Sequence, residues 1–157
     1  MRASNAWMVD ELEALYRARL TEFRRVATAI SGDRDLGADA VQEAFARAVR
    51  QRRRFRGEGT LEAWVWRIVV NAARDARRRT RPTPPSSTVL LREGQSDVGV
   101  PLERLTDRQR EIVFLHYFAD LGYDEIAAAL SISPGTVGAT LTAARRTLRD
   151  ALEEVEA

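Results

Sequence analysis

Residues 62–81 read EAWVWRIVVNAARDARRRTR, and their spacing predicts one basic helix with aromatic residues near its start. Successive residues of an α-helix turn by about 100°, which places the apolar and polar side chains of this stretch on opposite sides. The apolar side, which we expect to face a core, carries Val65, Ile68, Val69, Ala72 and Ala76. The polar side carries Arg67, Asn71, Arg74 and Arg78.

This helix has the side chains of a surface that binds a nucleic-acid strand. Arg and Asn bond phosphate oxygens and base edges, while Trp64 and Trp66 offer flat faces on which an unpaired base can stack. A solvated arginine face beside two core tryptophans is the competing interpretation, and the helix taken alone favours it. The neighbouring segments therefore have to decide between the two.

Length and composition limit the class of protein. With 157 residues, 45% of them hydrophobic, the chain can form one ordinary domain or two small ones. It has no apolar run near the roughly 18 residues of a membrane span and no secretory signal, so we expect a soluble, cytoplasmic protein without membrane insertion. The absence of cysteine excludes a disulfide framework, a thiolate nucleophile and a thiolate zinc site.

Charge is unevenly distributed along the chain. All 25 basic residues are arginine. Residues 1–80 hold 17 of them against 11 acidic residues, whereas residues 102–157 hold 6 against 10. The N-terminal half therefore carries the field that attracts a polyanion, and the C-terminal part does not.

Two amphipathic helices are predicted before the basic helix, at residues 7–30 and 36–53. Gly32 is expected to take the left-handed conformation that ends the first of them. The inward-facing residues are Leu12, Tyr16, Leu20, Phe23, Ala27 and Ile30 in the first helix, and Leu36, Ala40, Val41, Ala44, Phe45 and Ala48 in the second. The outer face of the second helix carries Asp39, Gln42, Glu43 and Arg47, which form either an ordinary solvated face or a docking face for a partner. A glycine-containing loop follows, with Thr60 as the expected N-cap of the basic helix.

Residues 81–101 have the composition of a linker, because they contain four of the five prolines with glycines and serines. After them, Thr106 and Gln109 have the spacing of a capping box. The helix that they start is strongly apolar, with Ile112, Val113, Leu115, Tyr117 and Phe118. His116, the only histidine, lies inside it and is interpreted as a structural or partly exposed residue.

The last segments predict a helix-turn-helix. A short helix at residues 122–130 is followed by a turn, by Ser133 as an N-cap and by Pro134 at the first position of another helix. Val137, Leu141, Ala144 and Leu148 form the buried stripe of that helix. The small core of the unit consists of Ile126, Leu130, Ile132, Val137 and Leu141.

In this order and at this length, these features resemble the extracytoplasmic-function sigma factors, the two-domain minimal type of bacterial RNA polymerase sigma subunit. Residues 39–45 resemble the core-polymerase-binding stretch of the family, residues 64–79 its promoter-melting helix, and residues 105–137 its second DNA-binding domain. The resemblance implies an all-α chain with an N-terminal helical domain (1–80), a flexible linker (81–101) and a C-terminal helix-turn-helix domain (102–157).

The resemblance also implies roles for individual residues. Asp39, Gln42, Glu43 and Arg47 would dock on the β′ clamp helices of core RNA polymerase, and the C-terminal domain on the β flap. The −10 promoter element and its unpaired strand would be held by Arg54, Phe55, Arg56, Trp64, Arg67, Asn71, Arg74 and Arg78. The −35 element would be contacted by Ser133, Pro134, Gly135, Thr136, Gly138, Ala139, Thr140, Thr142, Arg145 and Arg146. Promoter DNA, core polymerase and an anti-sigma factor are the implied partners of a chain that is monomeric when free.

The sequence departs from the family pattern at the start of the last helix. Positions that usually carry basic or polar side chains hold Gly138, Ala139, Thr140, Thr142 and Ala143. We therefore expect weak or shape-dependent −35 contacts, weak duplex binding by isolated residues 102–157, and local softness at Gly138.

Two other interpretations remain open from the sequence. A DNA-binding regulator that uses only the helix-turn-helix explains residues 102–157 equally well, but gives the faces at 39–47 and 64–79 no role. A sigma-like protein that has lost promoter reading is supported only by the depleted last helix. An enzyme is the least favoured, because we can place no catalytic residues, metal ligands or cofactor site.

Overall fold

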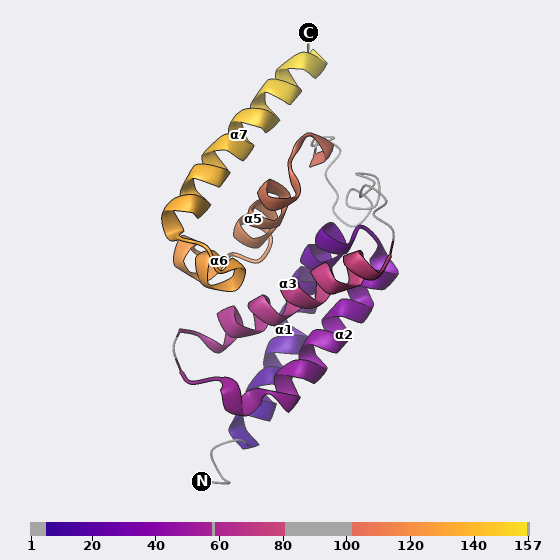
Figure 1. Cartoon of the computed structure of the whole chain (residues 1–157), viewed down its shortest axis with the longest axis vertical. Coiled ribbons are helices and arrows are strands. Elements are labelled where there is room, and N and C mark those ends of the chain that lie inside the picture. Colours follow the sequence, from indigo (N-terminus) through magenta and orange to yellow (C-terminus); the bar gives the residue numbers. More distant parts are fainter. Residues whose placement is uncertain (1–5, 58, 81–101, 157) are drawn as a thin grey trace.

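The computed structural model describes residues 6–57, 59–80 and 102–156, and these residues are mainly helical, with no strand among them. The longer helices are α1 (Ala6–Ser31), α2 (Arg34–Arg50), α3 (Leu61–Arg79), α5 (Asp107–Tyr117), α6 (Tyr123–Leu130) and α7 (Pro134–Glu156). Short 3₁₀ turns are η2 (Arg52–Arg54) and η3 (Leu102–Arg104). Figure 1 shows α1, α2 and α3 as one bundle, with α5 to α7 against one side of it and the end of α7 projecting away. The predicted all-α fold is confirmed, and the predicted linker lies outside the described residues.

Side-chain caps set where the helices begin. The side chain of Thr60 accepts a hydrogen bond from the Ala63 amide at 3.1 Å, which starts α3 as predicted. The capping box of α5 is also confirmed: the Gln109 amide donates to Thr106 Oγ1 at 3.2 Å, and the Thr106 amide donates to Gln109 Oε1 at 3.0 Å.

Both ends of α2 differ from the prediction. This helix begins at Arg34 rather than residue 36, because Asp33 Oδ1 accepts from the amides of Asp35 and Leu36 at 2.8 and 3.0 Å. It ends at Arg50 rather than residue 53, since the chain tightens into η2. Gly32 has the left-handed conformation predicted for it, with φ of 85°.

The C-terminal helices form the predicted helix-turn-helix. None of the described helices alone is long and apolar enough to cross a membrane. The α6 and α7 helices reach that length and hydropathy only when taken together, and the pair is bent by 103°. A bend of this size across a short turn is typical of a helix-turn-helix. Ser133 Oγ accepts from the Thr136 amide at 3.1 Å and caps α7. The predicted small core is confirmed, with Ile126, Leu130, Val137 and Leu141 buried and Ile132 packed against them.

All six α-helices contribute buried hydrophobic residues to one cluster. Its N-terminal part is aromatic: Phe23 lies with its ring centroid 4.3 Å from Trp66 and 5.2 Å from Phe45. The α3 helix contacts α1 and α2, and it also contacts α6. It therefore buries Trp66, Val70 and Ala73 in addition to residues of the predicted apolar side.

The α1 and α2 helices approach each other closely at Gly37. A Cβ built on Gly37 would lie 2.5 Å from Thr28 Oγ1 and 2.8 Å from the Thr28 backbone nitrogen, so the two helix backbones would have to move apart. Replacing glycine by alanine in a helix normally stabilises it by about 1 kcal/mol. For Gly37→Ala we expect the opposite sign, a loss of about 2 kcal/mol in the free energy of unfolding, because overpacking outweighs helix propensity.

Chemical denaturation monitored by circular dichroism would measure this effect. The control is Gly135→Ala in α7, where the nearest atom to an added Cβ is Ser133 Oγ at 3.9 Å and no loss of stability is expected. Equal stabilisation by both substitutions would contradict the close approach of α1 and α2.

Candidate nucleic-acid and partner-binding surfaces

The polar row predicted on α3 is largely exposed. Arg67, Asn71 and Arg78 lie at the surface, as the helical spacing predicts. Arg74, the fourth member, is half-buried and its guanidinium is bound by Glu111 of α5. The row is therefore a strip bounded on one side by the C-terminal helices.

The two tryptophans of α3 have different environments. Trp66 is fully buried against Phe23, so the interpretation of its indole as a stacking face for a base is wrong. Trp64 is half-buried and its ring centroid lies 5.6 Å from that of Phe55, at an interplanar angle of 53°. Phe55 and Trp64 are therefore partly exposed, unlike Trp66.

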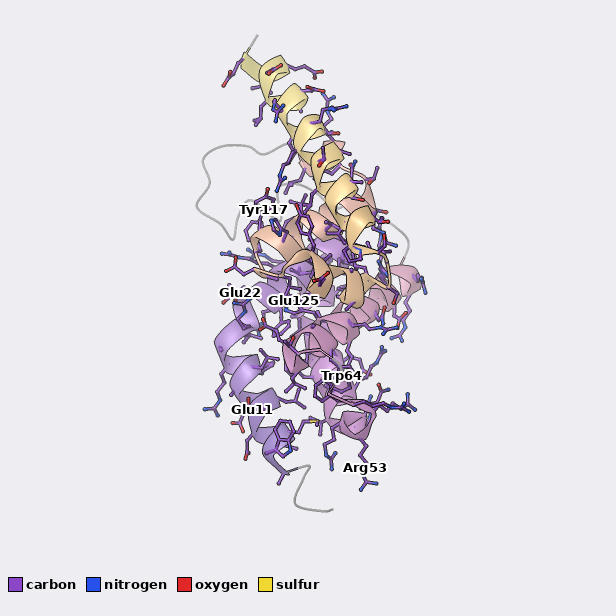
Figure 2. The ribbon with its side chains drawn as sticks, turned by 90° about the vertical axis from the view of Figure 1, so that its left-hand side faces the viewer. Glu11, Glu22, Arg53, Trp64, Tyr117 and Glu125 are labelled. Carbon is purple, nitrogen blue, oxygen red and sulfur yellow. The ribbon has the colours of Figure 1, made fainter. Side chains whose placement is uncertain are left out.

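The loop that precedes α3 adds arginines beside this aromatic pair. Arg54 and Arg56 are exposed, and Phe55 is half-buried between them. Figure 2 shows Arg53 and Trp64 in the same lower part of the molecule. Gly57 and Gly59 have φ of 77° and 81°, a left-handed conformation that side-chain-bearing residues rarely adopt.

A hollow of about 420 Å³ lies between α2 and α3. It is lined by Leu36, Asp39, Ala40, Glu43, Arg47, Ala72, Asp75, Ala76, Arg79 and Thr80. Three of the four predicted polymerase-binding residues line it, while Gln42 is exposed nearby on α2. Its walls combine small apolar side chains with three carboxylates, Asp39, Glu43 and Asp75, and two arginines, Arg47 and Arg79.

Ion pairs organise the rim of this hollow. Arg47 Nε donates to Glu43 Oε1 at 3.1 Å and Arg47 Nη1 to Asp75 Oδ2 at 3.4 Å, while Arg50 Nη2 donates to Glu43 at 3.2 Å. The hydrogen bonds from Arg47 and Arg50 lower the pKa of Glu43. Glu43 is therefore ionised at neutral pH, and its contribution to stability is lost only as the pH falls through that lowered pKa. Asp75 was not predicted from the sequence, because the spacing of α3 indicates only an apolar side and an arginine-rich side.

The predicted −35 face of α7 is exposed but offers few donors. Ser133 to Thr136, Ala139, Thr142, Arg145 and Arg146 are exposed, and Gly138 and Thr140 are half-buried. Thr140 Oγ1 donates to the Thr136 carbonyl at 2.7 Å, and Thr142 Oγ1 donates to the Gly138 carbonyl at 3.0 Å. Both hydroxyl protons are used inside the helix, so these side chains present acceptors and methyl groups rather than donors.

Aromatic residues of α5 and α6 support this face. Arg145 Nε donates to Tyr117 Oη at 2.8 Å, a hydrogen bond that raises the pKa of Arg145 above its already high ordinary value. Tyr117 belongs to the apolar run of its helix, yet 52% of its surface is exposed. The ring of Tyr123 lies 3.3 Å from where a Cβ on Gly138 would be, which gives this glycine a packing role that the sequence did not reveal.

Residues of α5 also reach the basic helix. Arg74 contacts both oxygens of Glu111, and Arg77 Nη1 lies 2.9 Å from Asp107 Oδ2. Neither acid was predicted from the sequence, because nothing in the spacing of one helix shows that it meets another. A carboxylate inside the apolar run of residues 111–118 was the available signal, since buried acids are rarely unpaired.

His116 has a structural role, as expected. Its Nδ1 lies 3.1 Å from the Leu121 carbonyl, and its ring packs edge-on against those of Tyr117 and Tyr123. Within the residues that the structure describes, no group of three or more His, Asp or Glu side chains could hold a metal ion.

Family models match both parts of the chain. Residues 15–83 match sigma-70 region 2, and residues 102–148 match sigma-70, region 4. The ECF RNA polymerase sigma-E factor of Escherichia coli is 31% identical over 134 residues, which cover 70% of this chain and 70% of the relative. The ECF RNA polymerase sigma-E factor of Haemophilus influenzae is 28% identical over 139 residues, which cover 73% of this chain and 74% of the relative.

Solved structures share the fold. CnrH in complex with the cytosolic domain of CnrY superposes with a TM-score of 0.76 at 23% identity, over 98% of this chain and 97% of that one. The sigma factor RpoE from Bartonella quintana, in complex with the anti-sigma factor NepR, has a TM-score of 0.73 at 21% identity, over 92% of this chain and 98% of that one. At these identities the likeness concerns the fold alone.

The different environments of the two tryptophans can be tested by truncation. Trp66→Ala should lower the free energy of unfolding by about 3 to 5 kcal/mol, because it leaves a large cavity beside Phe23. Trp64→Ala should cost about 1 kcal/mol, since its ring is only half-buried. Urea denaturation measures both, and equal losses would show that α3 is rotated relative to this description.

Proposed function

This chain belongs to the extracytoplasmic-function sigma factors, and we propose that it holds the core enzyme through α2 and the −10 strand through α3. It is a sigma factor that directs RNA polymerase to promoters. The assignment of individual residues rests on one observation: Arg67, Asn71 and Arg78 form an exposed strip next to the Phe55–Trp64 pair. This strip combines phosphate donors and a stacking surface, the two parts that binding of a single strand requires.

The aromatic pair can supply only part of the free energy that promoter opening requires. Extruding a base from a duplex costs a few kcal/mol, and stacking it on an aromatic side chain returns about 1 to 3 kcal/mol. With Trp66 in the core, Phe55 and Trp64 offer a platform for about one base. The remaining free energy then has to come from hydrogen bonds of Arg and Asn to the strand and from the polymerase.

The hollow between α2 and α3 is the proposed docking site for core polymerase. Asp39, Glu43 and Asp75 provide carboxylates there, and Ala40 and Ala76 provide apolar surface. These features suit a helix that presents basic and apolar residues, such as one of the β′ clamp helices named above. Asp75 extends the docking site from α2 onto α3.

We propose that the −35 contact is weak. Thr140 and Thr142 bond their own helix, which leaves Arg145 and Arg146 as the charged side chains of the predicted −35 set. These two residues suit phosphates, and phosphate contacts fix position without reading sequence. The C-terminal part would then position the polymerase on the DNA, and α3 would read the promoter.

The remaining assignments follow from family membership. We propose that the chain acts in the cytoplasm, has no catalytic centre or cofactor of its own, and uses the nucleotide chemistry of the polymerase. RpoE of Bartonella quintana is bound by an anti-sigma factor, and we propose a partner of that class for this chain. The proposed domain limits are residues 1–80 and 102–157, joined by residues 81–101. A regulator that acts without polymerase is not favoured.

In vitro transcription tests the whole proposal. Purified protein and core RNA polymerase would be incubated with fragmented genomic DNA, and transcript 5′ ends would be mapped. We expect discrete starts that share an upstream motif, conserved around −10 and weak around −35. A footprint on duplex DNA without polymerase, together with an absence of starts, would support the regulator instead.

Promoter opening should depend on the α3 strip. Asn71→Ala and Arg78→Ala should each reduce the rate of open-complex formation about tenfold on a mapped promoter, because each removes a strand contact worth about 1 to 3 kcal/mol. Both side chains are exposed, so the melting temperature should change little. Permanganate footprinting measures opening, and Arg24→Ala on the exposed surface of α1 is the control. Normal opening by both variants would remove the strip from the site.

Core binding should depend on the charge of α2. Glu43→Arg places a cation among Arg47 and Arg50 and should weaken binding to core polymerase about tenfold. Glu11→Arg, an equal change of charge at an exposed position of α1, should have no effect (Figure 2). Fluorescence anisotropy of labelled protein titrated with core enzyme measures both affinities, and equal affinities would exclude the hollow as the docking site.

A further inference from the structure

We propose that Asp107 and Glu111, the α5 acidic pair, hold Arg74 and the nearby Arg77 of α3, so that Arg74, a predicted strand contact, is withheld from a DNA strand and the free chain competes with its own ligand. The two acids stand four residues apart on α5, and the arginines that they bind, Arg74 and Arg77, stand three apart on α3. The inference rests on the proposed strand-binding role of α3. It adds a regulatory contact between the N-terminal and C-terminal parts of the chain.

The contact between Arg74 and Glu111 has the geometry of phosphate recognition. Arg74 Nη2 lies 2.7 Å from Glu111 Oε2, and Arg74 Nε donates to Oε1 at 3.3 Å. This two-pronged arrangement matches the way in which a guanidinium binds two phosphate oxygens. A carboxylate in this position therefore uses the same donors that a strand would need.

Burial distinguishes this ion pair from an ordinary surface pair. The Glu111 side chain is only 9% exposed and that of Arg74 is 25% exposed. A carboxylate that stays buried without a cation is strongly disfavoured. Glu111 can therefore leave Arg74 only if α5 moves far enough from α3 to expose the carboxylate to water. Arg108 also lies 3.8 Å from Glu111, on the same helix, and partly compensates its charge when the pair opens.

A second ion pair fixes the register of the contact. Arg77 Nη1 lies 2.9 Å from Asp107 Oδ2, one helical turn along from the first pair. Because both acids and both arginines follow helical spacing, the two pairs can form together only when α5 lies at one position along α3. The α5 acidic pair therefore specifies a particular closed arrangement.

Two further contacts across the same boundary have the same polarity. The guanidinium of Arg25 lies 5.6 Å from the ring centroid of Phe118, and Arg19 donates a hydrogen bond to the Ala119 carbonyl. In all four contacts the cation comes from α1 or α3, and the electron-rich group comes from α5 or the residues just after it. All four contacts thus place a cation of the N-terminal part against an electron-rich group of the C-terminal part.

This arrangement has a quantitative consequence for DNA binding. If a strand binds only the open form, its apparent affinity is reduced by the fraction of molecules that are open. Neutralising the α5 acidic pair should raise that fraction and the affinity together. Salt alone cannot test this, because it weakens both the ion pairs and the binding of a polyanion.

The first test measures strand binding by the full chain. Fluorescein-labelled single-stranded oligothymidine of about 20 nucleotides would be titrated with the wild type and with the Asp107→Asn, Glu111→Gln double variant. We expect the double variant to bind about tenfold more tightly. The control combines Asp124→Asn and Glu153→Gln, which make the same change of net charge at exposed positions and should leave the affinity unchanged. Equal gains in both double variants would overturn the proposal in favour of a general charge effect.

The second test measures closure without DNA. Because the chain has no cysteine, Ala46→Cys on α2 and Ala143→Cys on α7 provide exposed sites for a donor and an acceptor dye. Energy transfer should decrease in the neutralised variant and in Arg74→Glu, with helicity by circular dichroism retained. Combining Arg74→Glu with Glu111→Arg restores the ion pair with exchanged charges and should recover the transfer.

The two measurements separate the failure of this inference from that of the proposed function. Unchanged transfer in every variant would overturn the closed contact alone, and the role of α3 would stand on promoter opening. A loss of transfer with no strand binding by any variant would overturn both the competition and the proposed strand site. If Arg74 serves both contacts, the variant that combines Arg74→Glu with Glu111→Arg should recover energy transfer without recovering strand affinity.

Discussion

The α3 helix is packed by other helices over about half of its circumference, and this packing determines what its remaining surface can do. The buried half contains Trp66 and Val70, which tie α3 to the common core. One edge of the exposed half meets α2 at the hollow, and the other meets α5 at Arg74. Between these edges only a narrow strip is free. Three different contacts therefore share one helix.

Arginine supplies nearly every polar contact that this helix makes. A guanidinium can bind a carboxylate or a phosphate with the same donors, and which anion it binds depends on local concentration and on burial. In the hollow, Arg47 is held between Glu43 and Asp75, so its donors are already engaged by the protein. Along the exposed strip, Arg67 and Arg78 face solvent, where a strand can reach them. The chain thus uses one residue type for structure and for recognition, and the two uses differ in exposure: the Arg47 side chain is 23% exposed, whereas that of Arg78 is 78% exposed.

Sequence spacing predicted most of the fold because its signals are local. Caps at Thr60 and Thr106 and the apolar stripe of α7 each depend on residues within a few turns, and all are confirmed. Contacts between helices were beyond such reasoning. A helical wheel places Trp66 beside the polar strip, and only the packing of Phe23 against it shows that the ring is buried. Likewise, the exposed row was predicted from spacing, whereas the partner of Arg74 required the position of another helix. The roles of these residues in binding remain proposals.

The plain outer surface of α7 has a consequence for how this protein could be redirected. Ala139, Thr142 and Ala143 are exposed, and the helix is held in place by residues on its opposite side, such as Leu141 and Ala144. Side chains on the outer surface can therefore be exchanged with little effect on folding. Asparagine, glutamine or arginine placed there would add the hydrogen-bonding groups that distinguish one base pair from another in the major groove. The chain is thus a scaffold on which a new upstream specificity can be installed while the opening machinery of α3 is left intact.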